Sequence, residues 1–572
     1  MVARLVYLQI FKHEHYAALA NSTHLRKYEV PAPRGQIYLH DGEQKVPLAL
    51  NQTLKLVYAD PSIIPNQEET AKKLAEATGD NPQVFIDAMK KGKEYAVLKT
   101  RVNDETADKI KALKLRGVGM VNQDYRSYPE GELGAQILGF VNGEGKGQYG
   151  IEGALDGELK GVNGLLNAKT DTNGIPIATT DNLSRAATPG NDLVLTIDRN
   201  IQAQAEKFLK EGVQSTKADS GSIVVMDPNT GAVKAMANYP TFDPNAYQKV
   251  KDYTTFENDI VSSSFEPGSG FKVFTMAAGL DSGKVRPDTT YNDEGCLEMA
   301  KYKICNADNH KGGPNTNMTT VLRDSLNTGV IYILRQLGAN PDKVTFESKK
   351  NFHHYITEQF GFGDRTGIEQ SVESKGLINP PTSNDVNYAN MTFGQGLSVT
   401  MIQMASAVSA IANGGTLYKP YVVEERVRPD GSTDKTQPKV VKSDVISKQA
   451  ASDLTEMMKV VVQRGSGWAA RTPGYNIAGK TGTAQIADPN GGYLKQGNIG
   501  TFVGFAPAEK PQFVVMVRIN KPKVEGFAEK TTVPVFANLS RWLLQYYAVP
   551  PTPGAGESSM THHPNVFNLK LW

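Results

Sequence analysis

The sequence predicts a multidomain protein of the α+β class. Its 572 residues are more than one domain usually holds. Two strand-like runs, 221–227 and 232–237, flank the turn Pro228-Asn229-Thr230-Gly231, which predicts a hairpin. Helical runs at 272–280 and 401–412 and further β-rich runs follow in the same stretch of chain. Helices and antiparallel strands are therefore expected to pack together in one large unit.

The part of the chain before this unit is expected to fold separately. Residues from about 30 to 190 are rich in loops and mixed in pattern. Helical patterns occur near 68–77, 83–90 and 104–113, and strand patterns near 54–59 and 135–141. We place the larger unit at residues 191–548. The Pro-rich residues 549–572 are expected to form a flexible tail.

Composition argues against several classes of function. Hydrophobic residues make up 39% of the chain and charged residues 21%, which is ordinary for a globular protein. The net charge of +2 gives no indication of a surface that binds nucleic acid. None of the histidines has the H-E-x-x-H spacing of a helical zinc site. We therefore expect no bound metal and no other cofactor.

The stretch Ser269-Gly270-Phe271-Lys272 carries the first chemical signal. It follows Pro267-Gly268 and opens a helix-friendly run, so Ser269 is expected in the first turn of a helix. Positions i and i+3 of a helix share a face, so Lys272 can reach back to the Ser269 hydroxyl as a base. A lysine can do this only if burial or a second cation, such as Lys480, lowers its pKa. Taken alone, the stretch would more often be a capping serine and an exposed lysine.

A second signal, Ser325-Leu326-Asn327, lies between a helical stretch, 319–324, and an apolar run, 330–334. Ser325 could relay a proton between the lysines and a leaving group. The amide of Asn327 can both donate to and accept from a substrate peptide bond. Without the other motifs, both would be interpreted as ordinary helix or capping residues.

The third signal, Lys480-Thr481-Gly482-Thr483, precedes two apolar, β-rich runs, 500–505 and 513–519, which are expected to form adjacent strands. A lysine and two hydroxyls on a strand edge can hold a substrate carboxylate. Gly482 lets that backbone approach a neighbour closely. The N–H groups of Thr483 and Ser269 could together form an oxyanion hole. In this order, the three motifs are the parts of a serine acyl-transfer site.

A competing motif overlaps the third signal. Gly474 to Thr481 fits the nucleotide-binding pattern G-x-x-x-x-G-K-[ST]. That loop should leave a strand and open a helix. Here Pro473 precedes it and the turn-rich residues 487–492 soon follow, so no long helix can begin there. The context favours acyl transfer over nucleotide binding.

Together the motifs resemble those of class B penicillin-binding proteins, the monofunctional D,D-transpeptidases of bacterial cell-wall synthesis. The resemblance covers nearly the whole chain and extends to segments outside the three motifs. These segments are Arg34-Gly35-Gln36-Ile37, Arg126-Ser127-Tyr128-Pro129, Tyr149-Gly150-Ile151-Glu152, Thr196-Ile197-Asp198, Ile201-Gln202 and Gly394-Gln395-Gly396. Residues 501–507 and 412–415 look closest to the septal, cell-division branch.

The resemblance implies a penicillin-recognising transpeptidase domain, an antiparallel sheet with helices on both faces, at residues 191–548. It implies an elongated pedestal domain of the dimerisation type at 30–190. Residues 1–29 would be the end of a membrane-anchor region and its lead-in, with Met1–Phe11 as the last turns of the anchor. Those eleven residues could instead form a short amphipathic helix on the pedestal. No run of about 20 apolar residues, as a transmembrane helix needs, is present in the sequence.

Carried over by motif, Ser269 is the acylated nucleophile and Lys272 its general base. Ser325 and Asn327 relay the proton and position the substrate. Lys480, Thr481 and Thr483 bind the terminal carboxylate. The implied substrates are peptidoglycan stem peptides that end in D-Ala-D-Ala, and β-lactams would mimic that end and trap Ser269.

The resemblance also implies a location and partners. The family works on the extracytoplasmic face of the bacterial plasma membrane, so Cys296 and Cys305 are expected to form a disulfide, with reduced buried thiols as the alternative. A membrane glycosyltransferase and division-complex proteins are the implied partners, contacted through the pedestal and the anchor.

The chain departs from the family pattern at two places. Gly270 stands where the family usually has threonine, and glycine loosens a helix by about 1 kcal/mol relative to alanine. Residues 524–532 lack the family's tyrosine-glycine-glycine pattern. Within the same catalytic logic, a D,D-carboxypeptidase or a β-lactamase-like hydrolase stays open as an alternative. A division-complex scaffold with weak catalysis is an alternative of a different class.

Overall fold

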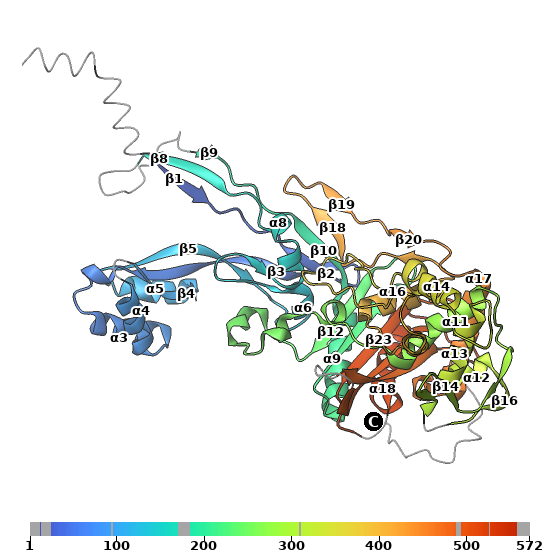
Figure 1. Ribbon diagram of the computed structural model, residues 1–572. Coiled ribbons are helices and arrows are strands. Elements are labelled where there is room, and N and C mark those ends of the chain that lie inside the picture. Colours follow the sequence, from blue (N-terminus) through green and yellow to red (C-terminus); the bar gives the residue numbers. More distant parts are fainter. Residues whose placement is uncertain are drawn as a thin grey trace, which may run out of the picture.

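The computed structural model describes residue 12 and residues 25–92, 95–169, 183–307, 310–487, 493–524 and 527–556. The molecule is elongated, with a small head at one end and a large compact unit at the other (Figure 1). Among the described helices, none is both long enough and apolar enough to cross a membrane. The sequence interpretation of Met1–Phe11 falls outside the described residues.

The head is built on three antiparallel strands, β3 (Gln44–Ala59), β4 (Ala96–Val102) and β5 (Val118–Ser127). Three helices pack on them, namely α3 (Gln67–Thr78), α4 (Pro82–Lys91) and α5 (Asp104–Ala112). Each helix begins after an asparagine, Asn66, Asn81 or Asn103, whose side chain accepts a hydrogen bond from a first-turn N–H group. The three predicted helices and the predicted strand at 54–59 are thereby confirmed.

A seven-stranded sheet connects the head to the large unit. Its order is β19-β18-β10-β2-β3-β4, with β5 paired to β3. The added strands are β2 (Ile37–Asp41), β10 (Asp192–Asp198), β18 (Val423–Val427) and β19 (Thr433–Lys435). Because β2 pairs with β3 on one side and with β10 on the other, strands from both parts of the chain share one sheet.

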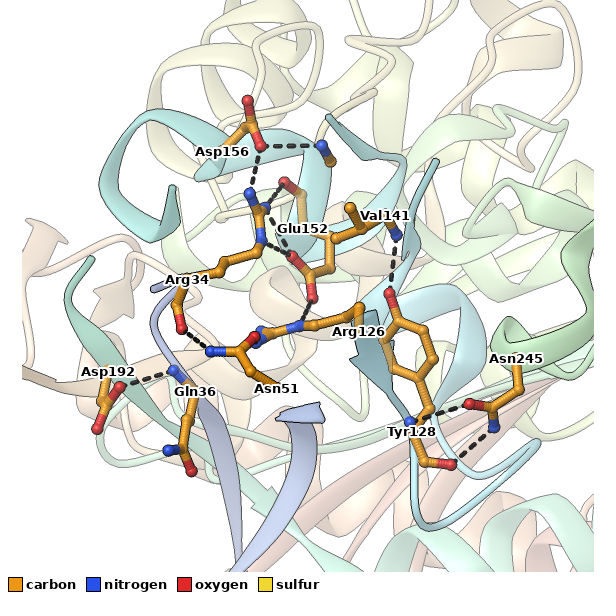
Figure 2. Close-up of polar contacts among 11 residues, drawn as sticks. Arg34, Gln36, Asn51, Arg126, Tyr128, Val141, Glu152, Asp156, Asp192 and Asn245 are labelled. Carbon is orange, nitrogen blue, oxygen red and sulfur yellow. Dashed lines mark hydrogen bonds and ion pairs between the residues drawn. The ribbon is translucent and has the colours of Figure 1, made fainter. Parts of the chain in front are cut away.

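A buried ionic cluster lies at this junction (Figure 2). Glu152 is fully buried and accepts from Arg34 Nε at 2.7 Å and from Arg126 Nε at 2.6 Å. Arg34 also pairs with Asp156 at 2.7 Å, and Arg126 donates to Asn51 at 3.0 Å. Three of the family-like segments noted in the sequence, 34–37, 126–129 and 149–152, therefore contact one another here. Their shared role is to hold the strands of the head against the helices α7 (Gly150–Ala154) and α8 (Asp156–Leu159).

The large unit is organised around a second, five-stranded antiparallel sheet. Its order is β12 (Val233–Tyr239), β11 (Ser220–Met226), β23 (Phe513–Asn520), β22 (Tyr493–Ala506) and β21 (Ala478–Ala487). One face is covered by α9 (Arg199–Thr216) and α18 (Ala528–Tyr546), and the other by α11 (Lys272–Asp281), α16 (Met401–Ala412) and α17 (Lys448–Arg464). The predicted hairpin, the paired strands and the sheet with helices on both faces are confirmed.

Successive side chains along each strand point to opposite faces of the sheet, so the core of this unit forms two layers. Ile223 and Val225 pack with α9 and α18, whereas Val224 and Met226 pack with α11 and α16. All four side chains are essentially inaccessible to solvent. The sheet is therefore a rigid wall between two apolar layers, and its edge strand β21 is held firmly.

Further elements complete the chain. They are β1 (Leu25–Val30), α6 (Ala135–Leu138), β6 (Phe140–Val141), β7 (Gly147–Gln148), β8 (Gly164–Lys169), β9 (Leu183–Arg185), α10 (Asp259–Ser262), β13 (Thr290–Asp293), β14 (Cys296–Met299), β15 (Tyr302–Cys305), β16 (Gly313–Asn317), α12 (Met318–Arg323), α13 (Asn327–Gln336), α14 (Phe346–His354), α15 (Asp385–Met391), β17 (Leu417–Tyr418) and β20 (Val440–Lys442). The lobe that holds α12, α13, β14 and β16 lies at the end of the molecule opposite the head (Figure 1).

Two expectations from the sequence are wrong. Residues 135–138 form the helix α6 and not a strand, because Gly134 and Gly139, both in left-handed backbone, bound a turn whose four side chains are all buried. Residues 549–556 are not a free tail, since Gly474 N–H donates to the Ala555 carbonyl and the Gly474 carbonyl accepts from Thr552 N–H. The rest of the predicted tail, 557–572, lies outside the described residues.

The junction gives a test of stability. Glu152→Gln removes the negative charge between two buried guanidinium groups, so it should lower the free energy of unfolding by about 3–5 kcal/mol. Glu105→Gln, which breaks an exposed pair with Lys109, should leave the free energy of unfolding almost unchanged. Urea denaturation of both variants measures the difference. Equal, small effects would show that the cluster does not stabilise the junction.

Candidate active site

Ser269 lies in a 3₁₀ turn, Gly268–Phe271, directly before α11. The turn is held from outside, because Gly268 N–H donates to the Gly394 carbonyl at 3.1 Å. The Ser269 side chain is partly exposed, whereas Lys272, at the start of α11, is fully buried. Ser269 can therefore be reached from solvent, whereas the amine of Lys272 is shielded from water.

Ser325 connects the two lysines of the site. It stands between α12 and α13 in left-handed backbone, with φ of 59°. Its hydroxyl accepts from Lys272 Nζ at 3.1 Å and from Lys480 Nζ at 3.1 Å. Lys272 Nζ also donates to the Ser325 carbonyl at 2.5 Å. The three residues form a chain, amine–hydroxyl–amine, along which a proton can pass.

Burial controls the charge of these amines. It lowers the pKa of Lys272 well below its ordinary value, and the positive charge of Lys480 lowers it further. Burial also lowers the pKa of Lys480 to about 7, although Glu529 opposes that shift. Burial therefore favours the neutral form of Lys272, and a neutral amine can accept a proton.

The motif Lys480-Thr481-Gly482-Thr483 lies on β21, at the edge of the five-stranded sheet. Lys480 is fully buried and also donates to the Thr481 carbonyl at 3.0 Å. A Cβ on Gly482 would lie 2.4 Å from Thr501 Oγ1 and 2.6 Å from the Pro267 carbonyl oxygen. Only glycine allows this strand to touch the turn that carries Ser269.

The same contact orients the N–H group of Thr483. A Cβ on Gly268 would lie 2.5 Å from the Thr483 carbonyl oxygen, so that carbonyl faces the serine turn and not β22. In an antiparallel strand the N–H and C=O of one residue point to the same side. The Thr483 N–H group therefore also faces the serine turn, on the side where an oxyanion formed at Ser269 would develop.

Asn327 is the first residue of α13, and its amide is held from the neighbouring hairpin. Its Nδ2 donates to the Cys305 carbonyl at 2.8 Å. Cys305, on β15, is joined by a disulfide to Cys296 on the paired strand β14. The hairpin that carries the disulfide therefore holds the side-chain amide of Asn327 in one orientation.

Two residues near the site were missed in the sequence. Ser466 Oγ lies 2.6 Å from Thr481 Oγ1, and Glu529 acts electrostatically on Lys480. The only sequence signal for Ser466 is its place between two glycines, Gly465 and Gly467, in the link from α17 to β21. Glu529 had no such signal, because its effect depends on how the first turn of α18 packs on the sheet.

The competing motif at Gly474–Thr481 is not a phosphate-binding loop. It leads into the strand β21 and opens no helix. Among the described residues, no group of three or more histidine, cysteine, aspartate or glutamate side chains is arranged to hold a metal ion. The site is therefore built from hydroxyl, amine and amide groups.

Comparison with known proteins agrees with this geometry. Residues 221–541 match the penicillin-binding protein transpeptidase domain, and residues 29–195 match the penicillin-binding protein dimerisation domain. This chain belongs to the class B penicillin-binding proteins. The two family models together match both of the expected domains, so the resemblance noted from the motifs is confirmed.

The relatives of this penicillin-binding protein cover most of its length. It is 33% identical to stage V sporulation protein D of Bacillus subtilis, over 96% of this chain and 83% of that protein. It is 32% identical to penicillin-binding protein PbpB of Mycobacterium tuberculosis, over 92% and 80%. Among solved structures, penicillin-binding protein 3 of M. tuberculosis in complex with ampicillin matches with a TM-score of 0.71 and 28% identity, over 93% of this chain and 98% of that one.

Two glycines beside Ser269 should respond in opposite ways to alanine. A Cβ on Gly270 would meet no atom closer than 3.7 Å, so Gly270→Ala should stabilise the protein by about 0.4–1 kcal/mol through the unfolded chain. Gly482→Ala should displace β21 from the serine turn and slow acylation by penicillin about 100-fold. Thermal unfolding and acylation rates of both variants are the measurements. Slow acylation in Gly270→Ala, or normal acylation in Gly482→Ala, would contradict this description of the contact.

Proposed function

We propose that this protein is a peptidoglycan D,D-transpeptidase in which Ser269 is the nucleophile and Lys272 the general base. The observation that carries the assignment is the Ser325 hydroxyl between two buried amines, one of them three residues from a partly exposed serine. The family membership supports the reaction class. The geometry and the motif positions support the individual roles.

In the first step, neutral Lys272 takes the proton of Ser269 Oγ as that oxygen attacks the penultimate D-alanine carbonyl carbon. The oxyanion that forms is stabilised by the N–H groups of Ser269 and Thr483. When the C–N bond breaks, the proton passes from Lys272 through Ser325 to the departing amine. The last D-alanine leaves, and the stem peptide remains as an ester on Ser269.

In the second step, an amine from a neighbouring stem attacks the ester carbonyl. Its proton passes to Lys272, and Ser269 Oγ leaves and recovers a proton from the same group. The products are the crosslinked peptide and the free enzyme. Burial of Lys272 favours this cycle, because a lowered pKa makes its ammonium give up each proton and return to the neutral amine.

The terminal carboxylate of the donor stem would bind at Lys480, Thr481 and Thr483. A carboxylate beside Lys480 favours the protonated ammonium and therefore raises a pKa that burial has lowered. The substrate carboxylate thus supplies a negative charge that balances the ammonium of Lys480. β-Lactams carry a carboxylate and a reactive carbonyl at similar places, which accounts for their capture by Ser269.

Location and protein partners are also part of the proposal. The Cys296–Cys305 disulfide suits an oxidising, extracytoplasmic compartment. We assign the protein to the outer face of the plasma membrane, with septal wall synthesis as its duty and a membrane glycosyltransferase and division proteins as partners of the pedestal. A fluorescent fusion distributed evenly along the lateral wall would argue against the septal role.

Covalent capture tests the proposed nucleophile. After incubation with benzylpenicillin, intact-mass spectrometry should show one stable drug adduct on the wild type and none on Ser269→Ala. Ser282→Ala, at the other end of α11, is the control and should keep the adduct. Rapid drug hydrolysis without an adduct would indicate a β-lactamase, and neither adduct nor hydrolysis in folded protein would favour a scaffold.

A further inference from the structure

A buried carboxylate lies beside α13 and has no part in the reaction as described. Asp293 is 1% exposed and accepts hydrogen bonds from four donor groups. The donors are Gly312 N–H at 2.8 Å, Gly295 N–H at 2.9 Å, Asn306 Nδ2 at 3.0 Å and the Thr328 hydroxyl at 2.7 Å. A carboxylate removed from water to this extent orders the groups that point at it.

Thr328 is the member of this cluster that belongs to the helix. Its hydroxyl lies 2.9 Å from Tyr291 Oη, and since Thr328 donates to Asp293, Tyr291 donates to Thr328. Its backbone N–H donates to Asn306 Oδ1 at 3.0 Å. The first turn of α13 is therefore fixed through both the main chain and the side chain of one residue.

Two consecutive residues of the hairpin end hold two consecutive residues of the helix. The Cys305 carbonyl accepts from the Asn327 side chain, and the Asn306 side chain accepts from the Thr328 backbone. Both Asn306 and Thr328 are buried, at 4% and 1% exposed. Rotation of the Asn327 side-chain amide would break its bond to the Cys305 carbonyl. Movement of the helix backbone at this turn would break the bond from Thr328 N–H to Asn306.

We propose that Asp293 and Thr328 are positioning residues for Asn327. They fix the turn that carries Asn327, so that its side-chain amide faces the peptide bond of the stem residue before D-Ala-D-Ala. The inference rests on the proposed role of Asn327 in substrate positioning. In a penicillin, the acylamino group takes the place of that peptide bond, whereas 6-aminopenicillanic acid has no acylamino group.

The test compares acylation by benzylpenicillin with acylation by 6-aminopenicillanic acid. Thr328→Val removes the donor to Asp293 at nearly constant volume and should lower the benzylpenicillin rate about 10-fold relative to the other drug. Thr328→Ser keeps the hydroxyl and should restore the wild-type ratio. Thr216→Val, at a buried threonine of α9 whose hydroxyl donates to the Gly212 carbonyl, is the matched control and should leave the ratio unchanged.

Tyr291→Phe is a milder variant that loses only the donor to Thr328. It should lower the ratio of the benzylpenicillin rate to the 6-aminopenicillanic acid rate by about 3-fold. This variant tests the inference even if Thr328→Val does not fold. An unchanged ratio in the folded variants, or an equal loss with both drugs, would overturn the inference. Asn327→Ala tests the proposed role of Asn327 separately from that of Thr328. If Asn327→Ala leaves the ratio of the two acylation rates unchanged, the proposed role of Asn327 is wrong. If the ratio changes in Asn327→Ala but not in Thr328→Val, only the positioning role of Thr328 and Asp293 is rejected.

Discussion

The burial of two lysine amines against one serine hydroxyl is the constraint on which the rest of the site depends. Lys272 and Lys480 are both fully buried, and both donate to Ser325 Oγ. Removing an ammonium from water costs several kcal/mol, so the arrangement persists only where the surrounding core is strong enough to offset that cost. The two apolar layers around the five-stranded sheet stabilise the fold enough to offset this cost. As a result, the lysine pKa is lowered and the amine can act as a base.

Close contact between backbones completes the site. β21 touches the serine turn at Gly482 and Gly268, where no Cβ could be accommodated. This contact places the Thr483 N–H group on the side of Ser269 without any side chain between them. The edge position of β21 has a second effect, because only an edge strand leaves one row of backbone groups free for a ligand.

Much of this arrangement could be predicted from the sequence, because the chemistry depends on local patterns. The serine and lysine of the first motif, the Ser325-Leu326-Asn327 turn and the strand that carries Lys480 are each readable within a few residues. The helices of the head could likewise be predicted from their local helical patterns. The pairing of Cys296 with Cys305 was expected only from the family resemblance.

What the sequence could not predict depends on contacts between distant segments. The left-handed backbone of Ser325 and the bond from Asn327 to the Cys305 carbonyl arise only when α13 packs on the hairpin. The short helix at 135–138 was predicted as a strand because four apolar-rich residues carry no clear period. The docking of 549–556 likewise depends on the loop at Gly474, far away in the chain.

The most direct test of the account is the titration of Lys272 itself. In protein labelled with ¹³C at the lysine Cε, NMR should show a resonance that titrates well below the ordinary lysine pKa of about 10.4 and that is absent from Lys272→Met. Removal of Lys480 as Lys480→Met should move that pKa upward, because a neighbouring positive charge is lost. If the Lys272 resonance titrates near 10.4 in the folded wild type, Lys272 is protonated at neutral pH and cannot be the base.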